Sequence, residues 1–284
     1  MIIKNNKIPK IFSSQFIRIL GYLSLGLIVI IWLIPIIWMV FNGFRDPADP
    51  FFNGILPTKY SLVNFQKILN NKETLRAFQN SFIVSSFAAA FSLTVGSLAA
   101  YGFSRFKFRG ASTYRLLIIT IRLFPGVLLA LALFHLAGLL KVYDTFIPLI
   151  FLNGMLNLPF TIWILDTMFN SIPVELEEAA WIDGTSRLGS IIKIVLPLIS
   201  PGLAATGAFV FLLSWNEYLF AVSFIRSSEK MLITTAIAAN IGQYTVDFTG
   251  LIATGMLASV PLLIIFLLIQ KYIIAGLTVG ALKQ

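Results

Sequence analysis

Residues 19–41 read ILGYLSLGLIVIIWLIPIIWMVF, an apolar run that contains no charged side chain. An α-helix rises 1.5 Å per residue, so this run is long enough to cross the ~30 Å hydrocarbon core of a bilayer. A cleaved signal peptide has a shorter apolar core, about 7 to 15 residues, and a small-x-small cleavage site. This run is longer and continues into Asn42-Gly43-Phe44-Arg45. We therefore expect a retained first transmembrane helix.

Apolar segments of spanning length recur along the chain, and each predicts a further transmembrane helix. They lie at residues 80–104, 114–137, 145–168, 201–224 and 252–275. The composition agrees, because 58% of the 284 residues are hydrophobic and only 12% are charged, against about 25% charged in soluble domains. We predict an all-α polytopic membrane protein with six transmembrane helices. It consists of a basic tail at 1–18 and a single transmembrane domain at 19–284.

The formal net charge of +9 indicates either nucleic acid or an anionic membrane surface as a contact. In a chain this apolar, Lys and Arg are typical of cytoplasmic loops that face anionic lipid. The tail before the first helix carries Lys4, Lys7, Lys10 and Arg18 and no acid. Six helices put both termini on the same side, and the basic tail predicts that this side is the cytoplasm. We therefore expect membrane lipid as a partner and no nucleic acid.

Few residue types suited to catalysis or metal binding are present. The sequence contains no cysteine and one histidine, His135, which excludes disulfides, thiolate metal sites and imidazole clusters. It also lacks a G-x-x-x-x-G-K-[ST] phosphate loop and the H-E-x-x-H and G-x-S-x-G motifs. We expect no catalytic residue, no metal site and no cofactor on this chain.

The connector between the fourth and fifth apolar segments, residues 173–197, differs from a simple loop. Pro173 suits the first turn of a helix. Glu175, Glu177 and Glu178 follow it, where the positive end of a helix dipole favours anions. The sequence therefore predicts a short, acidic helix at the start of this connector.

The same connector then predicts a bend and a second helix. Ala179 and Ala180 carry little side chain, so another surface can approach closely. Gly184 can adopt the left-handed conformation that ends a helix. A second helical stretch at about 186–195 is expected to end at Pro197. We predict two short helices at a glycine bend on the cytoplasmic face.

This segment resembles the cytoplasmic "EAA" loop of permease subunits in binding-protein-dependent ABC importers. The family pattern is E-A-A, three residues, G, nine residues and I-x-L-P. It falls without a gap on Glu178, Ala179, Ala180, Gly184, Ile194, Leu196 and Pro197. The resemblance implies that this stretch, together with Glu175 and Asp183, is a coupling element that seats in a cleft of a separate ATPase.

The resemblance extends over nearly the whole chain. It is carried further by YSLVNF at 60–65, AYGFSRF at 100–106, WNEY at 215–218 and GLTVGA at 276–281. These stretches are similar to the smaller, six-helix permease of the maltose-type carbohydrate branch. The resemblance implies a sister permease, two ATPase subunits that bind ATP and Mg, and an extracytoplasmic sugar-binding protein. It also implies a prokaryotic inner (plasma) membrane and import of a sugar or sugar derivative by alternating access.

Polar side chains at membrane depth are costly and are therefore candidates for function. Arg122 lies in the third predicted helix and Asp166 near the inner end of the fourth. We predict that they pair and neutralise each other, which is a structural role.

A second polar group, Trp215, Asn216, Glu217 and Tyr218, lies in the outer half of the fifth predicted helix. Aromatic faces beside amide and carboxylate acceptors suit the hydroxyl surface of a sugar in a cargo path. The alternative is an interfacial anchor with the rings at headgroup level and Glu217 in water.

Small residues recur at helical spacing along the second predicted helix, and they predict close packing, including packing against a partner subunit. They are Ser85, Ala89, Ser92, Gly96 and Ala99.

An ion-coupled secondary transporter is the alternative function. Such a carrier needs a buried titratable relay and often has an internal repeat with broken helices. Only Arg122, Asp166 and Glu217 are available for a relay, and no clear repeat is present.

Overall fold

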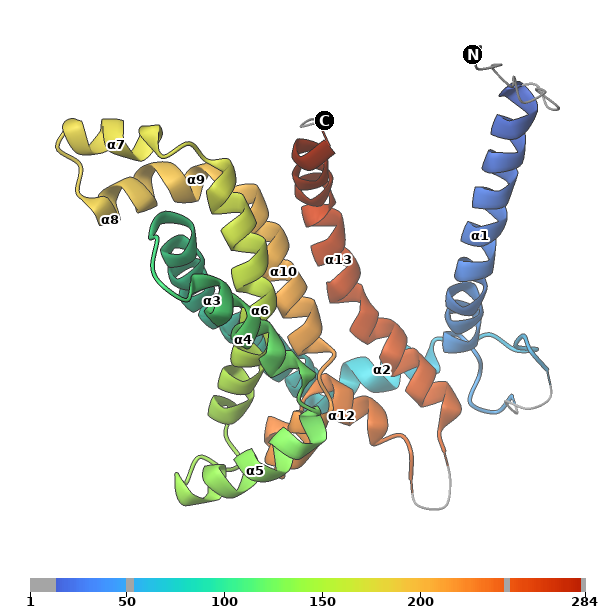
Figure 1. Ribbon diagram of the computed structural model, residues 1–284. Helices are drawn as coiled ribbons and strands as arrows, with labels where there is room; N and C mark the ends of the chain where they lie inside the picture. The colour runs from blue at the N-terminus through green and yellow to red at the C-terminus, as the bar shows by residue number, and fades with distance from the viewer. Residues whose placement is uncertain (1–13, 50–53, 243–245, 282–284) are drawn as a thin grey trace, which may run out of the picture.

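A computed structural model describes residues 14–49, 54–242 and 246–281 (Figure 1). The predicted tail at 1–18 thus falls outside the described residues up to residue 13. Within the described ranges the chain is helical, and its β-structure is limited to two isolated bridges, Arg45 with Tyr60 and Ile241 with Val246. The predicted all-α class is confirmed for these residues.

The helices follow one another in the order of the apolar segments, with short helices between them. They are α1 Ser14–Gly43, α2 Val63–Asn70, α3 Lys72–Arg105, α4 Ala111–Thr120, α5 Gly126–Leu139, α6 Phe146–Ser171, α7 Glu175–Ile182, α8 Arg187–Ser190, α9 Leu196–Leu198, α10 Ser200–Trp215, α11 Leu219–Phe224, α12 Ile233–Ala238 and α13 Phe248–Ala281. Short 3-10 turns lie at Ile121–Leu123 and Ser228–Lys230, and a π-helical turn lies at Ile191–Val195.

Four of these helices, α1, α3, α6 and α13, are long and apolar enough to cross a membrane by themselves. Two further spans are bent pairs. Ala111–Leu123 meets Gly126–Leu139 at 90°, and Arg187–Leu198 meets Ser200–Trp215 at 78°. The described chain therefore has four to six candidate spans, and the count of six depends on how the bent pairs are counted.

The predicted helix at 114–137 is not continuous, which corrects the sequence-based expectation. Phe124 is extended, with ψ of 129°, because the ring of the following Pro125 disfavours the helical conformation in the residue before it. Proline alone does not end a helix in this chain, since Pro35, Pro159 and Pro261 all lie inside continuous helices.

The predicted helix at 201–224 is interrupted as well. It ends at Trp215, and α11 begins at Leu219 after a short break. The Glu217 carboxylate stabilises this break, because its two oxygens accept hydrogen bonds from the backbone N–H groups of Phe220 (2.8 Å) and Ala221 (3.1 Å). These N–H groups lie in the first turn of α11 and have no partner within the helix.

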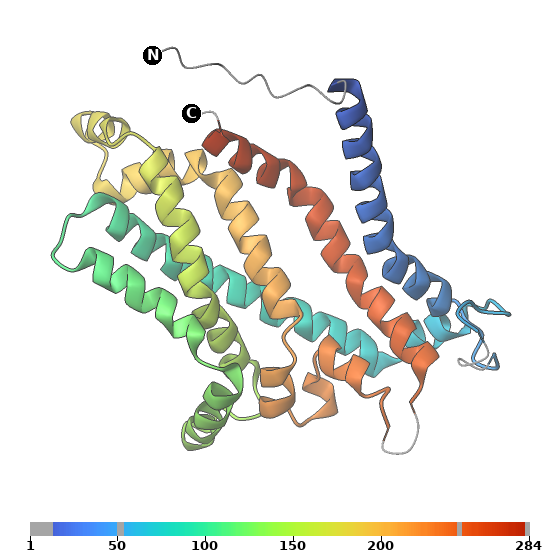
Figure 2. The ribbon, with the colours of Figure 1, turned by 45° about the vertical axis from the view of Figure 1, so that its right-hand side comes forward.

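The centre of the molecule is a close seam between α3 and α6, with α10 packed against both (Figure 2). Ser92 and Thr161 join the two helices by a hydrogen bond of 2.9 Å between their hydroxyl oxygens. A Cβ atom built on Gly96 would lie 2.5 Å from Cγ2 of Thr161. Ser92 and Gly96 of α3 therefore serve close packing inside this chain, and packing of α3 against a partner subunit stays a prediction.

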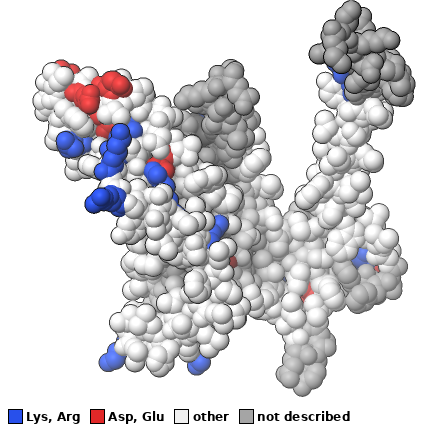
Figure 3. All heavy atoms as spheres, viewed as in Figure 1, with Lys and Arg blue, Asp and Glu red and all other residues white. Residues whose placement is uncertain are grey.

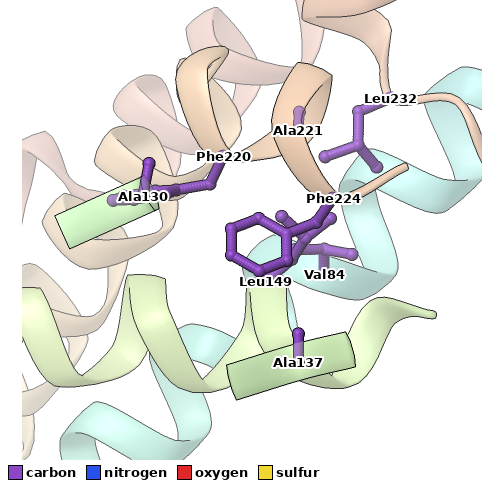
Figure 4. Close-up of a cluster of buried hydrophobic side chains, with 8 residues drawn as sticks. All are labelled: Val84, Ala130, Ala137, Leu149, Phe220, Ala221, Phe224 and Leu232. Atoms are coloured by element: carbon purple, nitrogen blue, oxygen red, sulfur yellow. The ribbon is translucent and has the colours of Figure 1, made fainter. Parts of the chain in front are cut away.

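The bent-off helix α5 packs at the end of the molecule that also carries α11 and α12 (Figure 1). A cluster of buried apolar side chains from α3, α5, α6 and the segment from α11 to α12 holds it there (Figure 4). The cluster consists of Val84, Ala130, Ala137, Leu149, Phe220, Ala221, Phe224 and Leu232.

A buried ion pair organises the loop between α1 and α2. Arg45 is fully buried, its Nη1 lies 3.3 Å from Oδ2 of Asp49, and its Nε donates to the Asn42 side chain at 3.0 Å. Burial opposes ionisation of Asp49, but hydrogen bonds from Thr58 and Lys59 and the Arg45 charge together lower the pKa of Asp49 below its ordinary value.

Replacement of Gly96 by alanine tests the seam between α3 and α6. The added methyl group meets the β-branched Thr161, which cannot yield easily, so we expect a loss of about 1–3 kcal/mol in the free energy of unfolding. Gly102→Ala in the same helix is the matched control, because nothing lies within 4 Å of its Cβ position. Removing a helical glycine there should stabilise by about 0.5–1 kcal/mol. Thermal unfolding of both purified variants checks the pair, and equal melting temperatures would contradict the close seam.

Candidate functional site

The connector between α6 and α10 folds as two short helices at a glycine bend, as the sequence predicts. α7 ends where Gly184 adopts a φ of +83°, a conformation that strains any residue with a Cβ atom. The N–H of Thr185 then donates to the carbonyl of Ala180 at 2.9 Å and closes the turn. α8 begins at once, because the Ser186 hydroxyl caps it by accepting from the N–H of Gly189 at 3.1 Å.

Trp181 fixes the two short helices against each other. Its indole Nε1 donates to the Ser190 hydroxyl at 3.0 Å. The guanidinium carbon of Arg187 lies 4.8 Å from the centre of the Trp181 ring, which is a favourable cation–π distance. The connector is therefore a defined element of the structure.

One face of α7 is anchored to the end of α3 by a buried ion pair. The Glu177 side chain is buried, and its Oε1 lies 2.6 Å from Nε of Arg105. The Tyr101 hydroxyl donates to the other carboxylate oxygen at 2.8 Å. Arg105 also donates to the carbonyl of Ile172, just before α7, at 3.1 Å. Each polar group of the pair thus has a partner, as a buried charge requires.

The opposite face of α7 is exposed and carries acids beside small and apolar side chains. Figure 3 shows the acidic atoms gathered at this end of the molecule, with basic atoms next to them. The exposed residues are Glu175, Glu178, Ala179, Ile182, Asp183 and Gly184. Ile182 is 87% exposed, which is unusual for an isoleucine, whereas Ala180 points inward and is buried. This face suits contact with another protein.

The second half of the connector is an anchor. Val195 and Ile199 are buried in a cluster with Leu165 and Phe169 of α6, and the predicted residue Leu196 packs against this cluster. Ile194 is half-buried. Most of the predicted coupling residues on α7 are thus exposed, whereas Leu196 packs into the helix bundle and Pro197 is exposed.

Pro197 does not end the second helix, contrary to the sequence-based expectation. The helical run continues to Leu198, and the 78° bend follows at the start of α10. A π-helical turn precedes the proline and is closed by the N–H of Leu196, which donates to the carbonyl of Ile191. This wider turn accommodates the proline, which lacks an N–H group and crowds the preceding turn of a regular helix.

Comparison with known proteins identifies the family of this chain. Residues 92–279 match the family of binding-protein-dependent transport system inner membrane components. The chain belongs to this family. It is thus a multi-pass permease of an inner membrane.

Relatives of this permease cover nearly its whole length. It is 35% identical to the trehalose/maltose transport system permease protein MalG of Thermococcus litoralis, over 94% of this chain and 97% of that protein. It is 29% identical to the sulfoquinovosyl glycerol transport system permease protein SmoH of Agrobacterium fabrum, over 96% of this chain and 95% of that protein.

Its fold is similar to a chain in the crystal structure of a bacterial ABC transporter involved in the import of the acidic polysaccharide alginate. The TM-score is 0.75 at 24% identity, and the match covers 92% of this permease and 99% of that chain.

The four residues at 215–218 do not form one exposed surface in the permease. Trp215 is 3% exposed and stacks on Phe211, with ring centroids 5.7 Å apart. Glu217 is half-buried and caps α11, while Asn216 and Tyr218 are exposed. The expectation of Glu217 in water is therefore wrong, because its carboxylate caps α11, and the buried Trp215 has a packing contact.

The predicted pairing of Arg122 with Asp166 is also wrong. Asp166 pairs with Arg115, whose Nε lies 3.1 Å from its Oδ2, and Arg122 donates to the Asn157 amide oxygen at 2.8 Å. α4 and α6 run side by side in opposite directions (Figure 2). Arg115 near the start of α4 therefore meets Asp166 near the end of α6, and Arg122 lies about two turns further along.

The sequence did not predict the structural role of Glu177. Two alanine variants distinguish this role from that of its exposed neighbour Glu178. Glu177→Ala leaves Arg105 buried without its carboxylate, so we expect a loss of about 3–5 kcal/mol in the free energy of unfolding. Glu178→Ala removes an exposed side chain and should change this quantity by about 0.5 kcal/mol or less. Thermal unfolding of the purified permeases measures the difference. Equal stability of the two variants would show that the buried pair contributes nothing.

Proposed function

We propose that this permease is one membrane-spanning half of an ATP-driven importer that translocates a sugar or sugar derivative by alternating access. The observation that carries the proposal is the division of α7. One face is fixed to α3 by the Glu177–Arg105 pair, and the other presents Ile182 and exposed acids to a partner. The carbohydrate cargo is supported by full-length relatives named as trehalose/maltose and sulfoquinovosyl glycerol permeases.

The proposed topology has six spans with both termini in the cytoplasm. It counts each bent pair as one span. The first turn of α1, the last turn of α13 and the α7–α9 segment lie at the same end of the molecule (Figure 1). The loop between α3 and α4 and helix α8 lie near this end (Figure 1), and they carry the exposed residues Lys107, Arg109 and Arg187, as the excess of basic residues in cytoplasmic loops predicts. The proposal treats 19–284 as one transmembrane domain with its coupling loop at 173–197.

The proposed partners are a sister permease, two ATPase subunits and an extracytoplasmic sugar-binding protein. The ATPase subunits would bind ATP and Mg, because this sequence has no phosphate loop. A sister permease is supported by α1, whose described side chains from residue 18 on are largely exposed and apolar. A helix that is apolar all round needs lipid or another subunit around it.

In this proposal, the docked ATPase moves α7, and the movement reaches the spanning helices by two routes. The first is the ion pair from Glu177 to Arg105 at the end of α3. The second runs through Val195, which is buried between α3 and α6, to the bend at the start of α10. Both routes consist of packed or hydrogen-bonded groups that transmit a displacement of α7.

The ion-coupled alternative is not supported. A proton or sodium relay needs acids that change their partners during transport. Asp166 is paired with Arg115, and Glu217 caps the first turn of α11. Family membership points to ATP-driven import as well.

Ile182→Asp tests the proposed docking face. Ile182 is 87% exposed, so the substitution should leave the fold intact, but it places a charge at the centre of the contact with the ATPase. We expect affinity purification of the wild-type permease from native membranes to recover a second permease and an ATPase. The amount of ATPase that co-purifies with the variant should be at least tenfold lower.

Leu69→Asp is the matched control, because Leu69 is also exposed but lies on α2 at the opposite end of the molecule. It should retain the ATPase. A wild-type permease that purifies alone would refute the importer, and an Ile182→Asp variant that keeps the ATPase would refute this docking face.

A further inference from the structure

Arg122 lies at the corner of the first bent span and close to the middle of the membrane. Its guanidinium contacts Asn157, which stands about 17 Å along α6 from Phe146 at a rise of 1.5 Å per residue. A hydrocarbon core is ~30 Å thick, so this contact lies near its midplane. A charged side chain at this depth is a candidate for function.

Neutral groups of α6 hold the guanidinium in place. Nη2 donates to the Asn157 amide oxygen at 2.8 Å, and Nε donates to the carbonyl of Leu156 at 3.3 Å. Asn157 is buried and its own amide donates to the carbonyl of Asn153, so the acceptor is fixed in orientation. Among the described residues Nη1 has no hydrogen-bond partner, and its two N–H groups are available to a ligand.

The positive charge of Arg122 is not compensated by an acid in the described part of the chain. The nearest candidate along α6, Asp166, is engaged by Arg115 at 3.1 Å. An arginine at membrane depth faces a water-filled path or a partner, because burying it alone is too costly. The side chain is exposed, as such a position requires.

The backbone beside Arg122 is irregular in a way that marks a cavity wall. Phe124 and Pro125 are extended, and the helix changes direction by 90° around them. Irregular backbone at membrane depth occurs only inside protein or along a water-filled cavity. Leu123 and Phe124 are 78% and 62% exposed, so this chain itself does not cover the break. Broken helices of this kind border substrate sites in other transporters.

We propose that Arg122 is a cargo-binding residue that recognises an oxyanion on the carbohydrate, namely a carboxylate, a sulfonate or a phosphate. The planar guanidinium group can donate two hydrogen bonds to such a group, and an anionic ligand would neutralise the positive charge of Arg122, which no acid of the described residues neutralises. Phe124, two residues further along the chain and 62% exposed, would offer an apolar face to the sugar ring. This inference rests on the proposed function and deepens it, because it assigns an acidic class of sugar derivative to this permease.

The test measures binding to the complete purified complex, containing the permease, its sister permease and the ATPase, in lipid nanodiscs. The probes are three matched pairs: digalacturonate with galactobiose, trehalose 6-phosphate with trehalose, and sulfoquinovose with glucose. In at least one pair the acidic member should bind about tenfold more tightly than its neutral counterpart, which is the scale of one charge-assisted contact. Arg122→Gln should abolish this preference, and Arg122→Lys should retain part of it.

Arg76→Gln is the control, because Arg76 is exposed near the start of α3 and its ion pair with Glu229 spans 3.8 Å at the surface. It should keep the acidic preference. Equal binding of acidic and neutral probes in every pair, or a preference that survives Arg122→Gln, would overturn the proposal. Loss of the sister permease from the Arg122→Gln complex would also overturn it, because the arginine would then pair across the subunit interface.

These outcomes are distinct from failure of the proposed function. If no ATPase joins the wild-type permease, the importer itself is refuted before any probe is added. If the complex assembles but shows no acidic preference, only the role of Arg122 is refuted.

Discussion

The buried ion pair between Glu177 and Arg105 is the interaction on which the connector depends. It joins α7 to the end of α3 at 2.6 Å, and both side chains are largely buried. Such a pair is tolerated only when the remaining donors and acceptors are satisfied, and here Tyr101 and the carbonyl of Ile172 satisfy them. Breaking one member leaves the other charge buried, so α7 cannot move away from α3 at low cost. A displacement of α7 is therefore expected to move the end of α3 with it.

This anchor explains why neighbouring residues of one motif have different physical roles. Glu178 and Ala179 lie on the exposed face, while Ala180 faces inward beside Glu177. The later motif positions, such as Leu196, pack against the helix bundle. A partner that binds the exposed face of α7 thus acts on a segment that is fixed at both ends, by the Glu177–Arg105 pair and by the packing of Leu196. The π-helical turn before Pro197 is the irregular part of that segment, and π-helical turns are frequent at functional sites.

The features that the sequence predicts correctly are local. The all-helical class follows from the length of the apolar runs, and the bend at Gly184 from the freedom of glycine in φ. The misses depend on distant contacts. In the sequence Glu177 looks like the other acids of α7, and its role depends on Arg105, which lies at the end of a helix far earlier in the chain. One local signal was available, because a spacing of three residues places Glu177 on the same helix face as the buried Ala180. Likewise, the pairing of Asp166 with Arg115 depends on the register of α4 against α6.

If α7 and the Arg105 end of α3 form one rigid body, the distance between them stays constant while the transporter cycles. The chain has no cysteine, so spin labels at Leu176→Cys and Leu98→Cys are unique on it. Both positions are exposed, and Leu176 lies on α7 at the edge of the docking face. Pulsed electron paramagnetic resonance on the complete complex measures this distance with and without trapped ATP. We predict the same distance distribution in both states. A shift of several ångströms between the two states would contradict the coupling of α7 to α3.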